Sequence, residues 1–133
     1  YTGDRADYAL DDALVKAVRQ MGLKAGCSFV TTLMASFEVL LARLSNQPDI
    51  VLGLPAAGQS ATGHLRLIGH CVNLLPLRSQ PLGTLSFREF LKQRKTGLLD
   101  ALEHQRITFG SLLKKLRIPR DTSRIPLVPV VFN

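Results

Sequence analysis

The chain lacks, or is poor in, the residues on which several classes of protein depend. Tryptophan is absent, aromatic residues make up only 6% of the 133 residues, and there are two cysteines, Cys27 and Cys71. Their spacing fits neither a zinc site nor a disulfide-stapled domain, so we expect free, buried thiols in a reducing cytoplasm. The longest nearly apolar run, residues 29–44, is interrupted by Glu38 and Arg43. It falls short of a membrane span, and we expect no membrane partner and no metal site.

Acidic residues are also scarce. Ten Asp and Glu stand against 17 Lys and Arg, which gives a net charge of +7. Residues 88–124 hold ten of the Lys and Arg and four of the Asp and Glu, so that this segment alone carries +6. A basic surface can meet nucleic acid, an anionic membrane or an acidic protein. The segment has no interleaved aromatic residues and no zinc-finger pattern, so we expect no nucleic-acid partner.

Hydrophobic periodicity and capping residues predict helices that alternate with strands. Asp11 and Ser28 are N-cap residues, and a capping box opens at Ser86. The helix after Ser28 is apolar nearly all round and must be covered on most sides. The expected elements are an edge strand at 5–10, a helix ended by Gly22 or Gly26, a helix at 29–44, strands at 50–54 and 71–75 with Pro76 ending the second, a helix from Ser86, a short helix at 108–116 and a final strand. This order predicts the α/β class, with a mixed sheet packed by helices in an α/β sandwich.

A cluster of charged residues precedes the last apolar segment. Arg120 and Arg124 flank Asp121 and Ser123. Asp121 can accept a bidentate pair of hydrogen bonds from either arginine, and Ser123 can close a local turn. Because the cluster adjoins an apolar strand, we expect a buried ion pair that braces this strand.

Four motifs give the chain a family resemblance. They are Gly53-Leu54-Pro55, Gly69 with Asn73, His104-Gln105 with Phe109, and Arg120-Asp121-x-Ser123-Arg124-x-Pro126-Leu127. In this order and approximate spacing they resemble the second lobe of the condensation domains of nonribosomal peptide synthetases. The resemblance implies a chloramphenicol-acetyltransferase-like fold, in which two similar lobes enclose a substrate tunnel.

The departures from the family pattern define which part of the domain is present. The motif His-His-x-x-x-Asp-Gly, which family members carry in the first lobe, is absent. Both ends of the chain look cut, and we expect residues 1–133 to be the C-terminal lobe alone. Gln59 stands where many members have Arg, and Thr108 where they have Pro. Both positions lie in loops or at helix starts, so neither change removes chemistry.

The resemblance also implies a function. The whole domain joins an acyl or peptidyl thioester on a donor carrier protein to the amine on an acceptor carrier protein. A His of the missing lobe acts on the amine, so we expect no catalytic residue in this chain and no activity of the chain alone. It binds no cofactor directly; the phosphopantetheine arms belong to the carrier proteins, whose acidic surfaces suit residues 88–124. The alternatives are an epimerisation or heterocyclisation relative, or a non-catalytic docking module.

The residues that the resemblance places toward the tunnel are Asn73, His70, Gly58 and Gln59. Asn73 could donate a hydrogen bond to an oxyanion or a thioester, or could satisfy backbone groups at a strand bend, and both roles stay open. His70 lacks the carboxylate or nucleophile that base catalysis requires, so we expect a structural role. We expect the same of His104, which caps a helix end and shares its motif with Gln105.

Overall fold

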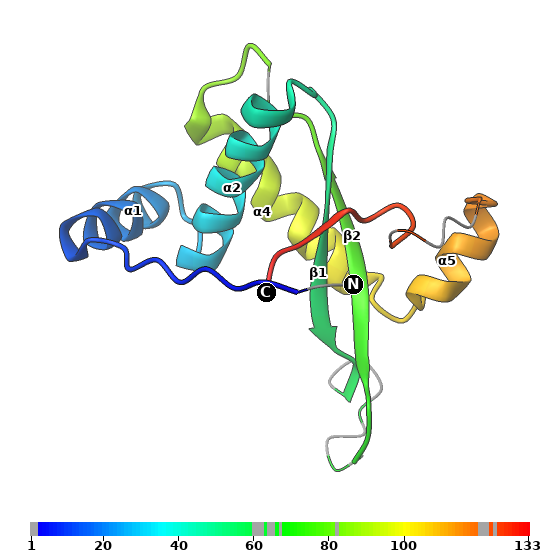
Figure 1. Ribbon diagram of the computed structural model, residues 1–133. Helices are drawn as coiled ribbons and strands as arrows, with labels where there is room; N and C mark the ends of the chain where they lie inside the picture. Colours follow the sequence, from blue (N-terminus) through cyan, green and yellow to red (C-terminus); the bar gives the residue numbers. More distant parts are fainter. Residues whose placement is uncertain are drawn as a thin grey trace.

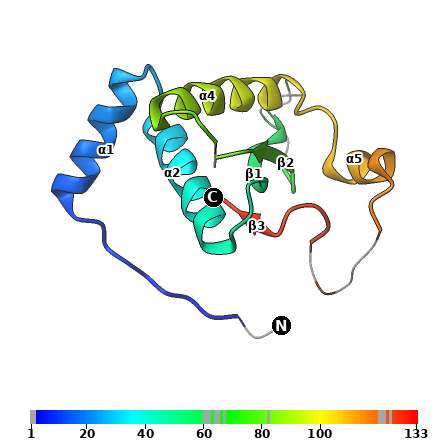
Figure 2. The ribbon, with the colours of Figure 1, turned by 90° about the horizontal axis from the view of Figure 1, so that it is seen from above.

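The computed structural model describes residues 3–59, 63, 66, 68–81, 83–119, 123 and 125–133. Its elements are α1 (Asp12–Lys24), α2 (Phe29–Ser45), β1 (Ile50–Ala57), β2 (Val72–Ser79), α4 (Phe87–Glu103), α5 (Phe109–Leu116) and β3 (Val130–Val131). Helices α2 and α4 pack on each other and on the sheet (Figure 1). Helix α1 lies outside α2, and α5 lies at the opposite end of the molecule beside β2 (Figure 2). The predicted α/β class is confirmed.

Capping side chains set the starts of the helices. Asp11, Ser28, Ser86 and Thr108 each accept a hydrogen bond from the backbone N–H three residues further on. The carboxylate of Glu89 also accepts from the Ser86 N–H at 2.8 Å, which completes the predicted capping box. Each such cap contributes about 0.5–2 kcal/mol to stability. The four predicted helices are therefore confirmed, with starts that the sequence specifies locally.

The sheet is mixed, as the sequence predicted. Its order is β2-β1-β3, with β1 antiparallel to β2 and parallel to β3. The expected end of the second strand at Pro76 is wrong, because β2 continues through Pro76 to Ser79. Within the described sheet β2 is an edge strand, where a residue without an N–H donor is tolerated. Strand β1 likewise runs past the expected end at residue 54 to Ala57.

The N-terminal segment does not form the edge strand expected at residues 5–10. Its residues are exposed and irregular, and Tyr8 is 86% exposed. Arg5 forms an ion pair with Asp7 at 2.8 Å instead of pairing through its backbone with a strand. No described strand runs beside this segment, so its backbone has no partner for a sheet. The predicted final strand is present as β3, which contains Val130 and Val131.

The main core lies between the helical layer and one face of the sheet. Met34 and Ala42 of α2 pack on Ile50 and Leu52 of β1 and on Leu77 of β2. A second cluster joins α2 to α4 through the buried residues Cys27, Ala35, Phe90 and Leu91. The expectation that α2 is covered on most sides is met only in part. Its exposed apolar side chains are Val30 (54%), Leu40 (50%) and Leu44 (76%).

Candidate functional site

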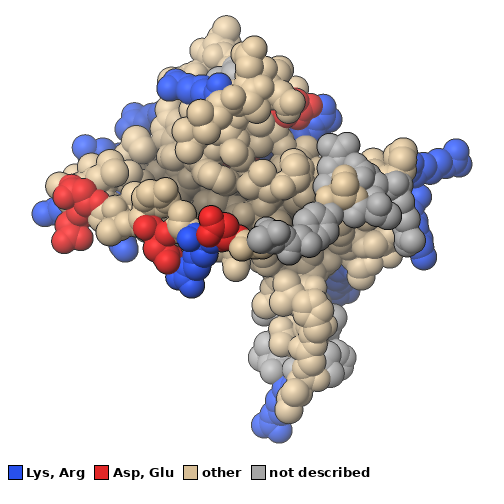
Figure 3. Space-filling view, viewed as in Figure 1, with Lys and Arg blue, Asp and Glu red and all other residues tan. Residues whose placement is uncertain are grey.

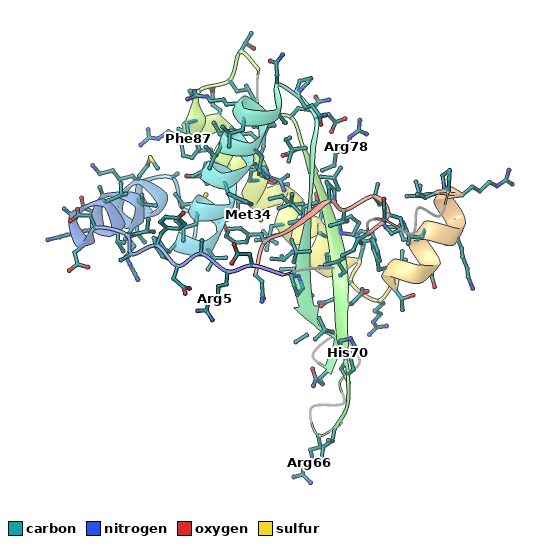
Figure 4. All side chains as sticks on the ribbon, in the orientation of Figure 1. Arg5, Met34, Arg66, His70, Arg78 and Phe87 are labelled. Carbon is teal, nitrogen blue, oxygen red and sulfur yellow. The ribbon has the colours of Figure 1, made fainter. Side chains whose placement is uncertain are left out.

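The β1–β2 hairpin extends well beyond the helical layer (Figure 1) and carries all four predicted tunnel residues. Gly58 follows the end of β1, and its N–H donates to the carbonyl oxygen of Cys71 at 2.6 Å. A side chain at Gly58 would collide with that carbonyl, so the hairpin requires glycine here. Gln59 comes next, and the exposed His70 lies across the hairpin (Figure 4). The structure thus places Gly58 opposite Cys71, the residue after His70, and the substrate-facing role of Gly58, Gln59 and His70 stays a prediction.

Asn73 lies on β2 and binds backbone groups more than 30 residues further along the chain. Its Nδ2 donates to the carbonyl oxygens of Gln105 at 2.9 Å and Ile107 at 3.0 Å. Its Oδ1 accepts from the Phe109 N–H at 3.0 Å, at the first turn of α5. Both amide hydrogens are therefore engaged by backbone, which leaves no donor for an oxyanion in this conformation. These contacts correspond to the second of the two roles left open for Asn73 by the sequence, in which its side chain satisfies backbone groups.

Gln105 takes part in the Asn73 contacts through its carbonyl oxygen, and His104 precedes it at the end of α4. His104 caps the C-terminus of α4, and its Nδ1 lies 2.8 Å from the carbonyl oxygen of Asp100. This is the helix-end position that the sequence predicted. Two of the four motifs, Gly69 with Asn73 and His104-Gln105 with Phe109, thus meet through hydrogen bonds between the Asn73 side chain and the backbone of Gln105 and Phe109.

The C-terminal charged cluster falls largely outside the described residues. Arg120, Asp121 and Arg124 are not described, so the predicted ion pair stays a prediction. Ser123 is described and is exposed. The segment after it covers the face of β1 opposite the helices, where the fully buried Val128 lies against Gly53.

A buried ion pair that we did not predict lies between α2 and α4. Glu38 Oε2 is 2.7 Å from Arg94 Nε, and the two side chains are 0% and 6% exposed. Arg94 Nη1 donates to the carbonyl oxygen of Arg78 on β2 at 3.1 Å, so this side chain joins two helices and the sheet. Burial raises the pKa of Glu38, and the neighbouring Arg94 and Ser79 oppose this effect only in part.

Two features of the sequence could have located this pair. Glu38 is an isolated charge within an apolar helix. Arg94 stands four residues after the buried Phe90 and four before Leu98, which places it on the inward face of α4. A charge on each of two buried helix faces indicates a paired contact, since an unpaired buried charge is very costly.

Other site classes find little support. Among residues 3–59, 68–81 and the rest of the described chain, no group of three His, Cys, Asp and Glu could hold a metal ion. Cys27 is buried and Cys71 is partly buried, and both are free thiols. No single helix in the described part is long and apolar enough to cross a membrane; α1 and α2 reach that length only together, across a 104° bend.

A sequence model of the family described as Condensation domain matches residues 1–133. The chain belongs to the condensation-domain family. This confirms the resemblance inferred from the four motifs.

Relatives of this condensation-domain chain include large peptide synthetases. Over 99% of its length it is 39% identical to tyrocidine synthase 3 of Brevibacillus parabrevis. Over its full length it is 35% identical to surfactin synthase subunit 2 of Bacillus subtilis. The chain spans only 2% and 4% of these two proteins.

Solved structures show the same fold. The condensation domain from the monacolin K polyketide synthase MokA matches with a TM-score of 0.82 and 28% identity, over 93% of this chain and 29% of that one. A four-domain nonribosomal peptide synthetase, holo-AB3403 bound to AMP and glycine, matches with a TM-score of 0.88. At 22% identity, over 93% of this chain and 9% of that one, the second match shows the fold alone.

Proposed function

We propose that the chain is the C-terminal lobe of a nonribosomal peptide synthetase condensation domain. The complete domain joins the acyl or peptidyl thioester of a donor carrier protein to the amine of an acceptor-bound amino acid, and forms an amide. The observation that carries this proposal is the family match over residues 1–133. The structural match to the MokA condensation domain covers 29% of that chain, which supports a part of the domain and not the whole. The catalytic histidine motif of the family belongs to the other lobe, so this lobe positions substrates and supplies no catalytic residue.

The hairpin forms the floor of the substrate tunnel in this proposal. The β1–β2 hairpin projects from the body, with Arg66 at its tip and His70 between this tip and the sheet (Figure 4). Gly58 and Gln59 directly follow the last residue of β1. Asn73 holds the base of the hairpin against the start of α5 through its three backbone hydrogen bonds. Asn73 is thus a positioning residue, which fixes the direction in which the hairpin crosses toward the other lobe.

The N-terminal lobe of the same domain is the proposed neighbour of the exposed apolar residues. Val30, Leu40 and Leu44 on α2 and Ile68 beside the hairpin leave much of their surface in solvent. Apolar side chains gain free energy when a partner surface removes them from water, so a partner is expected over some of these residues. We expect stable pairing with the first lobe when it is supplied, and self-association in its absence.

The carrier-docking surface is proposed at α5. Residues 104–119 contain no Asp or Glu, and Lys114, Lys115 and Arg117 are exposed there. The α5 end of the molecule carries basic side chains and no acidic ones in the view of Figure 3. An acidic carrier protein complements this surface and would present its phosphopantetheine arm to the tunnel; the chain itself binds no cofactor.

Binding of the neighbouring carrier domain tests this assignment. Charge reversal of Lys114→Glu with Lys115→Glu should weaken carrier binding about tenfold, because two attractive exposed pairs become repulsive. The effect should diminish at high salt. Lys24→Glu with Arg88→Glu makes the same charge change away from α5 and serves as the control. Equal weakening by both double variants would contradict docking at α5.

A further inference from the structure

A second surface feature lies on the far side of α2 from the hairpin. The C-terminal half of α1 and the first turns of α4 enclose a groove of about 330 Å³. Its walls are mainly apolar and include Met21, Ala25, Phe87 and Leu91. The proposed condensation role uses none of these residues.

The groove exists because α1 has a wider apolar face than α2 can cover. Val15 and Val18 are partly buried, and Gly22 is buried against the side chain of Thr32. Leu14 and Met21, on the adjoining part of the helix surface, remain 51% and 40% exposed. The close contact between Gly22 and Thr32 fixes α1 on α2. Helix α1 therefore cannot rotate to bury Leu14 and Met21.

The groove is held open by contacts at its end. Lys95 of α4 donates to the carbonyl oxygen of Gly26 at 2.7 Å, in the turn that follows α1. Cys27 in the same turn packs with Leu91 in the second core cluster. These contacts join the turn to α4 while the preceding part of α1 diverges from α4 (Figure 2). The groove is therefore a built feature of the helical layer.

The surroundings of the groove are basic. Lys24 and Arg88 line it directly, and no acidic residue does so among the described part of the chain. The exposed charged residues of α1 and of the first turns of α4 are six cations, Lys16, Arg19, Lys24, Arg88, Lys92 and Lys95, and two acids, Asp12 and Glu89. Glu89 is already engaged by its capping box with Ser86. The ligand that complements this site is apolar at its centre and acidic at its flanks.

The shape favours a helix as the occupant. The lining residues of α1 and its C-cap run from Ala17 to Ala25, which corresponds to about 12 Å of helix at 1.5 Å per residue. That length accepts side chains at positions i, i+3 or i+4, and i+7 of an amphipathic helix. A volume of about 330 Å³ is at the lower end of small-molecule sites, which span about 300–1,000 Å³. An open groove of this size suits inserted side chains better than an enclosed ligand.

A second copy of this chain does not supply such a helix. Among the described helices α1, α2, α4 and α5, none carries more Asp and Glu than Lys and Arg. We propose that the α1–α4 groove is a docking site for an acidic amphipathic helix of a separate protein or domain. This surface is distinct from the α5 surface proposed for carrier docking, and it adds a second protein contact to the lobe.

The two methionines provide a matched pair of probes. Met21 lines the groove, whereas Met34 is 1% exposed in the core. The 133-residue chain is labelled at its methionine methyl groups and observed by NMR. A synthetic acidic peptide, with leucines at i, i+3 and i+7 and glutamates at its flanks, is then added. The Met21 resonance should shift until the groove is saturated. The Met34 resonance should stay in place. The same peptide with lysine flanks, or with its leucines scrambled, should bind at least about tenfold more weakly.

Charge-reversed chains complete the test. Lys24→Glu with Arg88→Glu should weaken binding of the acidic peptide about tenfold, and Lys114→Glu with Lys115→Glu by less than about twofold. The groove proposal is overturned if the acidic peptide leaves Met21 unshifted, if the lysine peptide binds as well, or if both double variants weaken binding equally. It is also overturned if Met21 responds to phosphatidylserine vesicles and not to the peptide. Carrier binding at α5 is measured in a separate experiment, so the groove proposal and the carrier-docking proposal can each be refuted without the other.

Discussion

Replacing Arg94 by Met should strongly destabilise the chain. Arg94 lies 2.7 Å from Glu38, whose side chain is fully buried, and also donates to the carbonyl oxygen of Arg78. The Met side chain fills much of the same space but leaves the carboxylate of Glu38 without its cation. The perturbation therefore isolates the charge interaction from the packing of α4 on α2.

The expected magnitude follows from the burial of both partners. Removal of one member of a buried ion pair costs about 3–5 kcal/mol, a large share of the stability of a domain of this size. Glu38→Leu combined with Arg94→Met removes both charges, and should lie within about 1 kcal/mol of the unmodified chain or exceed its stability. Arg88→Met on the exposed face of the same helix is the control, with an expected change below about 0.5 kcal/mol.

Urea unfolding of the four proteins at pH 7 and pH 5 measures these differences. Burial raises the pKa of Glu38 above its ordinary value of 4.5, so the folded state binds the proton more tightly than the unfolded state. The penalty of the ionised carboxylate is present above the folded-state pKa and disappears as the pH falls to 4.5. Without Arg94 this pKa rises further, so the destabilisation should shrink between pH 7 and pH 5. Equal midpoints for Arg94→Met and Arg88→Met, or equal losses in the single and double variants, would refute the reasoning.

Three further outcomes are expected. Asn73→Ala removes three hydrogen bonds to backbone and should cost about 2–3 kcal/mol, with faster hydrogen exchange at the start of α5 than at α1. Asp121→Ala should cost about 3–5 kcal/mol in denaturant unfolding if its arginine pair is buried, and under about 1 kcal/mol if the pair is exposed. Arg78 lowers the pKa of Asp49 through hydrogen bonds, so the stability that Asp49 contributes is present above pH 3.8 and is lost at lower pH. The difference between Asp49→Asn and the unmodified chain in thermal melts should therefore be smaller at pH 2 than at pH 6.

Local chemistry made the helices predictable. Asp11, Ser28, Ser86 and Thr108 act through partners only three residues away, so their effect could be inferred without tertiary structure. The strand limits depended on contacts that the sequence does not display. Pro76 is tolerated because β2 is an edge of the described sheet, and residues 5–10 have no described strand beside them.

The candidate site, too, was predictable only in part from the sequence. The motifs located Asn73 and Gln105, but only the fold shows that the Asn73 side chain reaches a backbone segment 32 residues away. The sequence carried a signal for the Glu38–Arg94 pair, a charge on the inward face of each helix, but only the packing of α4 on α2 shows that the two charges meet. By contrast the family resemblance needed only the order of four motifs, and the match over residues 1–133 confirms it.

Single-turnover amide formation tests the central claim most directly. The complete domain that contains residues 1–133 is mixed with a donor carrier protein bearing an acyl thioester and an acceptor carrier protein bearing an aminoacyl thioester. The masses of both carrier proteins are then measured by intact-protein mass spectrometry. We expect the acyl group to leave the donor, which regains a free thiol, and to appear as an amide on the acceptor, while the isolated chain stays at background. Turnover by the isolated chain, or a complete domain that only inverts or cyclises the bound amino acid, would contradict the account.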